Sequence, residues 1–157
     1  MKILLPTDGS EASVAALGRL LPRLAWFASA PQLALLNVHP ALPYARAVAW
    51  AGKEAVHRYY EEEGVAAIAP AETVLAQAGV AFERVLRIGD PAHEIVRFAN
   101  EWHADLIAMG RHGHSALRVM VMGSVTQKVI ATSPVPVLLV EQAEGGNTIP
   151  GASVSPR

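Results

Sequence analysis

The chain has no cysteine among its 157 residues. This absence excludes disulfides, thiolate metal sites and a cysteine nucleophile, and it is typical of a reducing compartment, so we expect a cytoplasmic protein. The N-terminus carries one Lys before a short apolar run and no small-residue cleavage site, so we expect no secretory signal. The longest uncharged stretch, residues 24–45, is interrupted by Pro31, Pro40 and Pro43, which argues against a membrane span.

The sequence also lacks an excess of charge of either sign. Its net charge is -1 and its pI is about 6.6, with Lys and Arg scattered along the chain, so we expect no nucleic-acid binding. Trp26, Trp50 and Trp102 are isolated and form no stacking platform. There is no GxSxG, no HExxH, no Walker GxxxxGK[ST], and no GxGxxG after the first apolar run. We therefore identify no catalytic residue.

What the chain does have is an alternation of apolar runs and helical patterns. At this length a single domain is the simplest organisation. Alternation of strands and helices is typical of a parallel sheet with helices on both faces. The expected strands are residues 2–6, 33–39, 80–88, 105–109 and 135–140. Right-handed crossovers then give a three-layer, doubly wound, Rossmann-like α/β fold with five parallel strands in the order 3-2-1-4-5.

Caps and breakers set the expected helix limits. Ser10 is expected to cap a first helix that Pro22 kinks or unwinds and Pro31 ends. Asp90 is the expected N-cap of a third helix, with Pro91 at its first position.

Two further helices are expected. The second covers about residues 47–78, and we expect Gly64 and Pro70 to divide it. The last helix begins near Gly123 and ends at Ser133-Pro134.

The predicted strand order brings two polar loops together. Residues 7–10 (TDGS) follow the first strand and residues 110–113 (GRHG) follow the fourth, at the point where open α/β sheets bind ligands. Gly110 and Gly113 would let the backbone approach a ligand closely or adopt positive φ. Gly123-Ser124 at a helix start would direct free N–H groups and the positive helix end at an anion. The arrangement suits phosphate.

Four segments carry a more specific resemblance: PTDGS, GDPAHEIV followed by ADLIAMG, GRHGHSALRVMVMGSVTQKV with its Gly-x2-Gly-x9-Gly-Ser spacing, and SPVPVLLV. Together they resemble the nucleotide-binding subgroup of the universal stress protein family, over residues 1–141. The resemblance implies an adenine nucleotide alpha hydrolase-like domain that binds ATP, with Mg²⁺ carried on the phosphates. It also implies a homodimer through Val135 to Val140, and residues 142–157 read as a disordered tail.

Matched positions imply the following roles. Pro6, Thr7 and Asp8 would lie by the adenosine, Val38 would meet adenine through its backbone, and Met109 and Gly110 would line the ribose. Phosphate contacts would come from Arg111, Gly113, Gly123, Ser124, Val125 and Thr126.

Each of these features has a plainer interpretation. Asp8 could cap the first helix, Met109 could fill the core, and the glycines could be required only by the fold. His112-x-His114 lacks a third ligand at compatible spacing, so we assign no metal to protein side chains. An ATP-dependent regulatory or stress protein is favoured over a dimeric interaction module and over an ATP hydrolase, whose turnover would be slow at most. Protein partners, and the stress or pathway involved, are not assigned.

Overall fold

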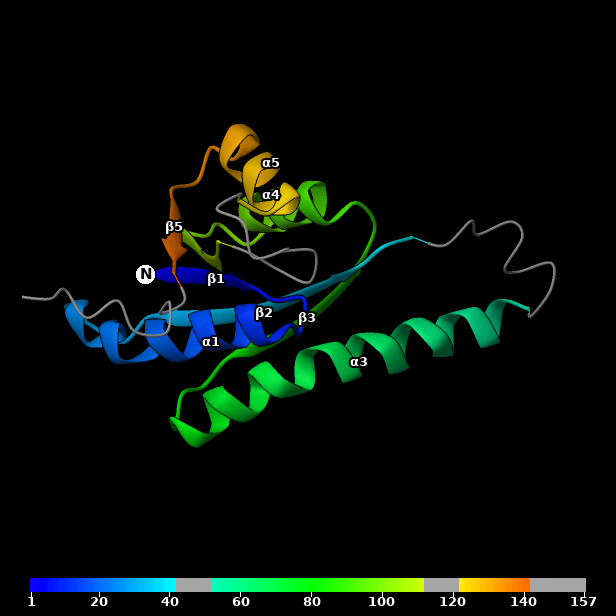
Figure 1. Cartoon of the computed structure of the whole chain (residues 1–157), viewed down its shortest axis with the longest axis horizontal. Helices are drawn as coiled ribbons and strands as arrows, with labels where there is room; N and C mark the ends of the chain where they lie inside the picture. The colour runs from blue at the N-terminus through cyan, green and yellow to red at the C-terminus, as the bar shows by residue number, and fades with distance from the viewer. Residues whose placement is uncertain (42–51, 112–121, 142–157) are drawn as a thin grey trace, which may run out of the picture.

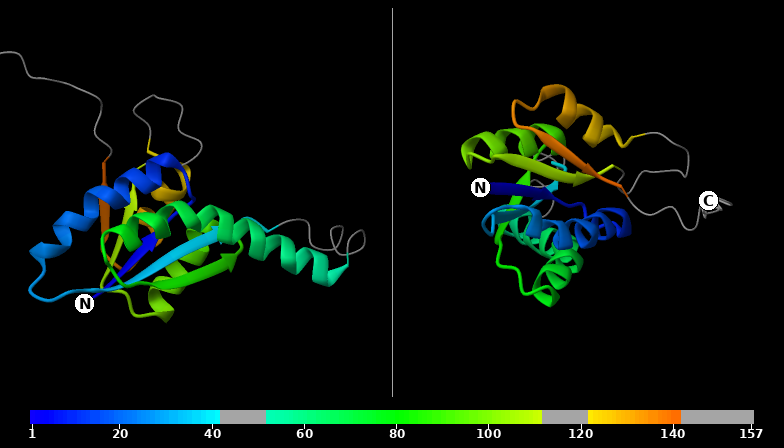
Figure 2. Two further views of the ribbon diagram at one scale, coloured as in Figure 1. Left: turned by 90° about the horizontal axis from the view of Figure 1, so that it is seen from below. Right: turned by 90° about the vertical axis from the view of Figure 1, so that its left-hand side faces the viewer.

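The computed structural model describes residues 1–41, 52–111 and 122–141. Its centre is a parallel sheet in the order β3-β2-β1-β4-β5, which confirms the predicted topology. Helices α1 and α3 cover one face and α4 and α5 cover the other, giving three layers (Figures 1 and 2). The strands are β1 Lys2–Pro6, β2 Gln32–His39, β3 Glu83–Ile88, β4 Leu106–Gly110 and β5 Val137–Val140.

The central strand β1 contributes side chains to both cores. Ile3 and Leu5 pack with α1 and α3, and Leu4 between them packs with α4 and α5. Because successive side chains of a strand point to opposite faces, a run of apolar residues is what burial on both faces requires. This burial holds the C-terminal end of β1, and the loop that follows it, in a fixed place.

Helix α1 (Glu11–Leu20) begins as predicted and ends early. Ser10 is its N-cap and accepts a hydrogen bond from the Ser13 N–H at 3.2 Å. A 3-10 helix, η1 (Leu21–Trp26), follows with Pro22 in its first turn, which confirms local unwinding there. Pro31 does not end the helix, since helical structure stops at Trp26 with a 3-10-type bond from Phe27 N–H to Leu24 O.

Helix α3 (Lys53–Gln77) is continuous, so the predicted division at Gly64 and Pro70 is wrong. Gly64 is buried against β3, where a Cβ would lie 3.3 Å from the Leu86 methyl carbons, so its lack of a side chain serves packing. Pro70 lies on the exposed side of the helix. Because proline has no N–H, the Ala66 carbonyl four residues earlier lacks its helical partner, and since Ala66 is also exposed this carbonyl can bond water instead. The expected start near residue 47 lies outside the described residues.

The remaining helices follow prediction closely, and two strands are shorter than predicted. Helix α4 (Pro91–Glu101) starts after the Asp90 N-cap, and α5 (Ser124–Thr132) ends at Ser133. Strand β3 begins three residues later than expected, because Val80 N–H is used by Leu75 O in the exit from α3. Strand β5 begins two residues late, because Ser133 Oγ accepts the Val135 N–H at 3.1 Å and forms a turn.

No helix among the described residues is long and apolar enough to cross a membrane.

Candidate functional site

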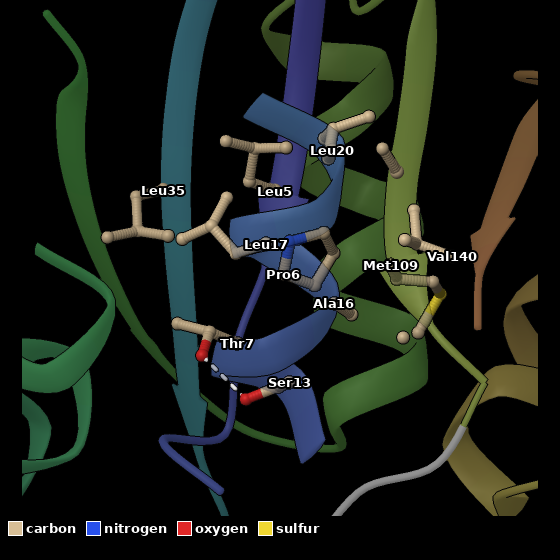
Figure 3. A pocket seen from close by; sticks show the side chains of 12 residues that line it. Leu5, Pro6, Thr7, Ser13, Ala16, Leu17, Leu20, Leu35, Met109 and Val140 are labelled. Atoms are coloured by element: carbon tan, nitrogen blue, oxygen red, sulfur yellow. Dashed lines mark hydrogen bonds between the residues drawn. The ribbon is translucent and has the colours of Figure 1, made fainter. Parts of the chain in front are cut away.

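The C-terminal ends of β1 and β4 lie together, as the predicted topology requires. Pro6 and Thr7 share a cavity with Met109 and Gly110 beneath α1 (Figure 3). The cavity measures about 10 Å³, room for about one water, so it is a packing gap and not a ligand pocket. What it establishes is that the two predicted segments are neighbours.

Thr7 is the fixed point of the loop after β1. Its N–H donates to Leu36 O at 2.8 Å, and its hydroxyl shares a 3.0 Å hydrogen bond with the Ser13 hydroxyl, drawn in Figure 3. The buried Asn37 amide donates to Thr7 O at 2.9 Å. Sequence reasoning missed Asn37, although a polar residue inside the apolar run LALLNVH was a signal for it.

Asp8 and Ser10 form a bonded turn at the start of α1. One Asp8 carboxylate oxygen accepts from the Ser10 N–H at 3.1 Å and from the Ser10 hydroxyl at 2.6 Å. Since Ser10 itself caps the helix, Asp8 braces the cap and is not the cap. These bonds hold the Asp8 side chain in a fixed orientation at the start of α1.

Gly9 places this loop directly on α3. Its φ is 76°, and a Cβ would lie 2.3 Å from the Ala67 carbonyl oxygen. Both the left-handed backbone and the close approach require glycine here. The loop after β1 therefore has little freedom to move relative to α3.

The start of α5 is fastened to the end of β4. The buried Thr126 hydroxyl donates to Gly110 O at 3.2 Å, and Gly123 N–H donates to Arg111 O at 3.0 Å. Gly110 itself ends β4 in strand pairing with Val140, so it does not adopt the positive φ that was one of its two expected uses. These bonds set the first turn of α5 beside the carboxyl end of the central strands.

That first turn has an open N-terminus, meaning one whose N-cap residue supplies no capping side chain. The N-cap is Gly123, which has no side chain to accept a hydrogen bond, and the first turn contains no acidic residue. The leading N–H groups of a helix have no intrahelical partners and carry partial positive charge. Ser124 adds a hydroxyl at an exposed position. The arrangement is chemically suited to hold an anion.

Arg111 places a cationic side chain at this end of β4. An Arg111 guanidinium nitrogen is 2.7 Å from a Glu141 carboxylate oxygen, with both side chains partly exposed. The pairing orients the Arg111 side chain at the edge of the sheet. Glu141 was not among the predicted residues, because its partner is thirty positions away along the chain.

The apolar members of the predicted set share one core. Met109 is buried, and Val38 and Val125 are partly buried against the same cluster, on the α4 and α5 face. The structure thus brings together Pro6 and Thr7 with Met109 and Gly110, and Arg111 with the start of α5. Gly113 lies outside the described residues, as do His112 and His114.

No group of three or more His, Asp or Glu side chains suited to a metal ion occurs within residues 1–41, 52–111 and 122–141.

Comparisons with known proteins place the chain in one family. A model of the universal stress protein family matches residues 1–141. Universal stress protein MJ0531 of Methanocaldococcus jannaschii is 32% identical over 142 residues, which cover 90% of this chain and 82% of that protein.

Two solved structures are also similar. The structure of hypothetical protein MJ0577 superposes with a TM-score of 0.72 at 31% identity, covering 91% of this chain and 96% of that one. A universal stress protein in complex with cAMP superposes with a TM-score of 0.63 at 26% identity, covering 91% and 98%.

Proposed function

Because the chain belongs to the universal stress protein family, we propose that it binds ATP in the crevice between β1 and β4 and acts as a nucleotide-dependent regulatory protein. The observation that carries the proposal is the open N-terminus of α5, which lacks both a capping side chain and an acidic first turn. The cAMP complex of a relative supports an adenine nucleotide as ligand.

We assign the phosphates to the start of α5. The N–H groups of Ser124, Val125 and Thr126 and the Ser124 hydroxyl would donate to phosphate oxygens, with Gly123 allowing close approach. Arg111 would supply a guanidinium from the end of β4. Thr126 has a second role, since its hydroxyl holds Gly110. Gly113, outside the described residues, completes the proposed phosphate set.

The adenosine part would lie across the ends of β1, β2 and β4. Pro6, Thr7 and Asp8 would face the nucleoside, Val38 would meet the base through its backbone, and Met109 and Gly110 would line the ribose side. Mg²⁺ would be carried by the phosphates.

A regulatory role suits this chemistry better than turnover. Asp8 is the one carboxylate in the crevice loops, and its Oδ1 already accepts two hydrogen bonds from Ser10. An efficient phosphoryl-transfer site needs several positioned cations and a group that orients the attacking water. We therefore propose slow hydrolysis at most, in a cytoplasmic protein whose nucleotide state alters its partners.

We also propose a homodimer through Val135 to Val140. Strand β5 is an edge of the sheet, as Figure 2 shows. Two large apolar side chains in this part of the chain are exposed, Leu138 of β5 to 39% and Ile130 of α5 to 43%. An apolar edge strand is a ready template for pairing with a second chain. Sedimentation should show dimers at micromolar concentration, and monomers alone would contradict the proposal.

The decisive experiment is calorimetric titration of nucleotide-free protein with ATP and Mg²⁺. We expect one ATP per chain, weaker binding in Gly113→Ala, and still weaker binding in the double variant with Ser124→Ala. If the double variant bound ATP as tightly as the parent, the phosphate assignment would be wrong. If the parent bound no ATP, the interaction module, with structural glycines, would be the better description.

A further inference from the structure

A second pocket, of about 220 Å³, opens on the α3 face of the sheet. Its lining includes Asn37 and His39 of β2, Ile88 of β3, and Tyr60, Glu61 and Gly64 of α3. The phosphate site proposed above is at the start of α5, which covers the opposite face (Figure 1). None of the described residues assigned to ATP lines this second pocket.

The pocket exists because of how α3 crosses the sheet. At Gly64 the helix approaches Leu86 as closely as a missing side chain permits. One turn earlier, Tyr60 and Glu61 stand beside the last residues of the strands, and α3 continues past the strand ends (Figure 1). Space is left between the helix and the ends of β2 and β3.

The walls suit a flat, apolar ring. Tyr60 is 7% exposed, and Leu86 and Ile88 add aliphatic surface. The His39 ring packs edge to face on Tyr60 with ring centroids 5.2 Å apart, and Tyr59 contacts both rings. Aromatic side chains held in this way offer a rigid surface for another ring. Since drug-sized ligands occupy roughly 300–1,000 Å³, a pocket of about 220 Å³ suits one or two rings.

Three residues of the lining, Asn37, His39 and Glu61, offer hydrogen-bond acceptors. Asn37 donates one of its two amide N–H groups to Thr7 O, and its amide oxygen is a further acceptor. His39 Nδ1 lies 2.8 Å from Pro40 O, so that nitrogen carries the proton in the neutral ring and Nε2 is an acceptor. Glu61 adds a carboxylate, 3.4 Å from His57 Nε2.

Arg87, the one arginine among the described lining residues, does not offset these acceptors. The Arg87 guanidinium lies 5.1 Å from the Phe98 ring centre and 2.7 Å from a Glu101 carboxylate oxygen, both on α4. Its charge is therefore directed to the opposite face of the sheet. A ligand matched to this pocket would donate hydrogen bonds and be neutral or cationic.

We propose that this pocket binds a small aromatic molecule of one or two rings that carries an N–H or ammonium donor. The ring lies against Tyr60, Leu86 and Ile88, and the donor reaches Asn37, His39 or Glu61. Among aromatic amines, binding strengthens with positive charge because the Glu61 carboxylate lies in the lining.

Occupation of the pocket acts on the crevice loop, a consequence that rests on the proposed function. Asn37, in the pocket lining, holds the Thr7 carbonyl, and Gly9 packs on Ala67, three residues after Gly64. A ligand that shifts Asn37 or α3 therefore shifts the loop proposed to face the adenosine. Any such coupling is reciprocal, so ATP changes the affinity of the aromatic ligand by the same factor.

The binding test uses tryptamine, indole and indole-3-acetate as cationic, neutral and anionic probes of one ring system. Ligand-observed NMR on the full chain should show saturable binding in the order tryptamine, indole, indole-3-acetate. Glu61→Lys should weaken tryptamine at least fivefold and reverse the order of the charged probes. Glu62→Lys makes the same charge change one residue away, outside the lining, and should leave both unchanged.

Circular dichroism checks that both variants keep the parent fold, which is expected because Glu61 and Glu62 are exposed. Absence of saturable tryptamine and indole binding at millimolar concentration would overturn the site. Equal losses in Glu61→Lys and Glu62→Lys would also overturn it, since they would indicate general charge attraction.

The coupling is tested by repeating the ATP titration with tryptamine at saturation. A change in the ATP Kd of twofold or more supports coupling, and it should disappear in Glu61→Lys. An unchanged ATP Kd overturns the coupling and leaves the pocket in place. A parent that binds tryptamine and no ATP would defeat the proposed function and the coupling together, while the pocket would stand on its own binding data.

Discussion

The N-termini of α4 and α5 have nearly the same backbone and opposite chemistry. The N-cap residues have φ and ψ of -70° and 120° at Asp90 and -58° and 144° at Gly123, both extended. Asp90 accepts the His93 N–H at 3.0 Å, and Pro91 has no N–H to satisfy. At α5 no side chain of the described residues performs either task. The sequence therefore provides a capping side chain at the N-terminus of α4 and a glycine N-cap at the N-terminus of α5.

The comparison also separates two uses of glycine. Gly9 is required by its positive φ and by the Ala67 carbonyl beside it. Gly123 has a φ that any residue adopts, so its backbone does not explain the glycine. What glycine contributes at position 123 is an absent side chain, so the N-cap residue itself supplies no acceptor to the first-turn N–H groups.

Gly123→Asp should make α5 resemble α4, and it carries the largest expected effect. The new carboxylate would cap the helix and repel phosphate, so we expect ATP affinity to fall by about 100-fold, or about 2.7 kcal/mol. Calorimetric titration measures the loss, and urea unfolding should show a stability equal to or above that of the parent. Parent-like ATP affinity in this variant would show that the start of α5 does not hold the phosphates.

Asp90→Ala should remove the N-terminal cap of α4 without creating a nucleotide site there. The variant loses the capping hydrogen bond from His93 N–H and the ion pair with the Lys128 ammonium 3.6 Å away. These losses should lower the free energy of unfolding by about 1 kcal/mol. Urea denaturation measures this change. The ATP Kd should stay within twofold of the parent value, and a large change would mean that the two helix ends are not independent.

Ser124→Ala should sharpen the comparison by removing the exposed hydroxyl at the first residue of α5. A single lost hydrogen bond to phosphate is worth about 1 kcal/mol, so ATP should bind about fivefold more weakly. Thr132→Ala is the matched control, because it removes a hydroxyl that bonds Lys128 O at the far end of the same helix. Equal effects of the two variants on ATP affinity would contradict a direct Ser124 contact.

The smallest effect concerns pH. The hydrogen bond from His93 N–H, aided by the Lys128 charge, lowers the pKa of Asp90 below its usual value of 3.8, while partial desolvation opposes this. A depressed pKa in the folded state stabilises the protein above pH 3.8, and this contribution is lost as pH falls through the folded value. The stability difference between parent and Asp90→Asn should therefore shrink from pH 5 to pH 3 in urea unfolding. A difference that stays constant over this range would contradict the assignment.

Prediction from sequence succeeded where an interaction spans a few residues. Ser10 and Asp90 cap helices through N–H groups three positions ahead, and Pro22 unwinds the helix that contains it. It failed at α3, where Gly64 and Pro70 were judged by helix propensity alone. Burial of Gly64 against Leu86 and exposure of Pro70 outweigh that propensity, and neither can be known before α3 is placed on the sheet.

The sequence itself determined three features, because each depends on residue type and short spacing. They are the alternation of strands and helices, the buried strand β1, and a start of α5 with neither a capping side chain at the N-cap nor an acidic residue in the first turn. The tertiary structure alone decided that Asn37 holds Thr7, that Gly9 lies on Ala67, and that Thr126 holds Gly110. These contacts join residues 16 to 58 positions apart, and they exist only once strand order and helix placement bring distant segments within hydrogen-bond or van der Waals reach.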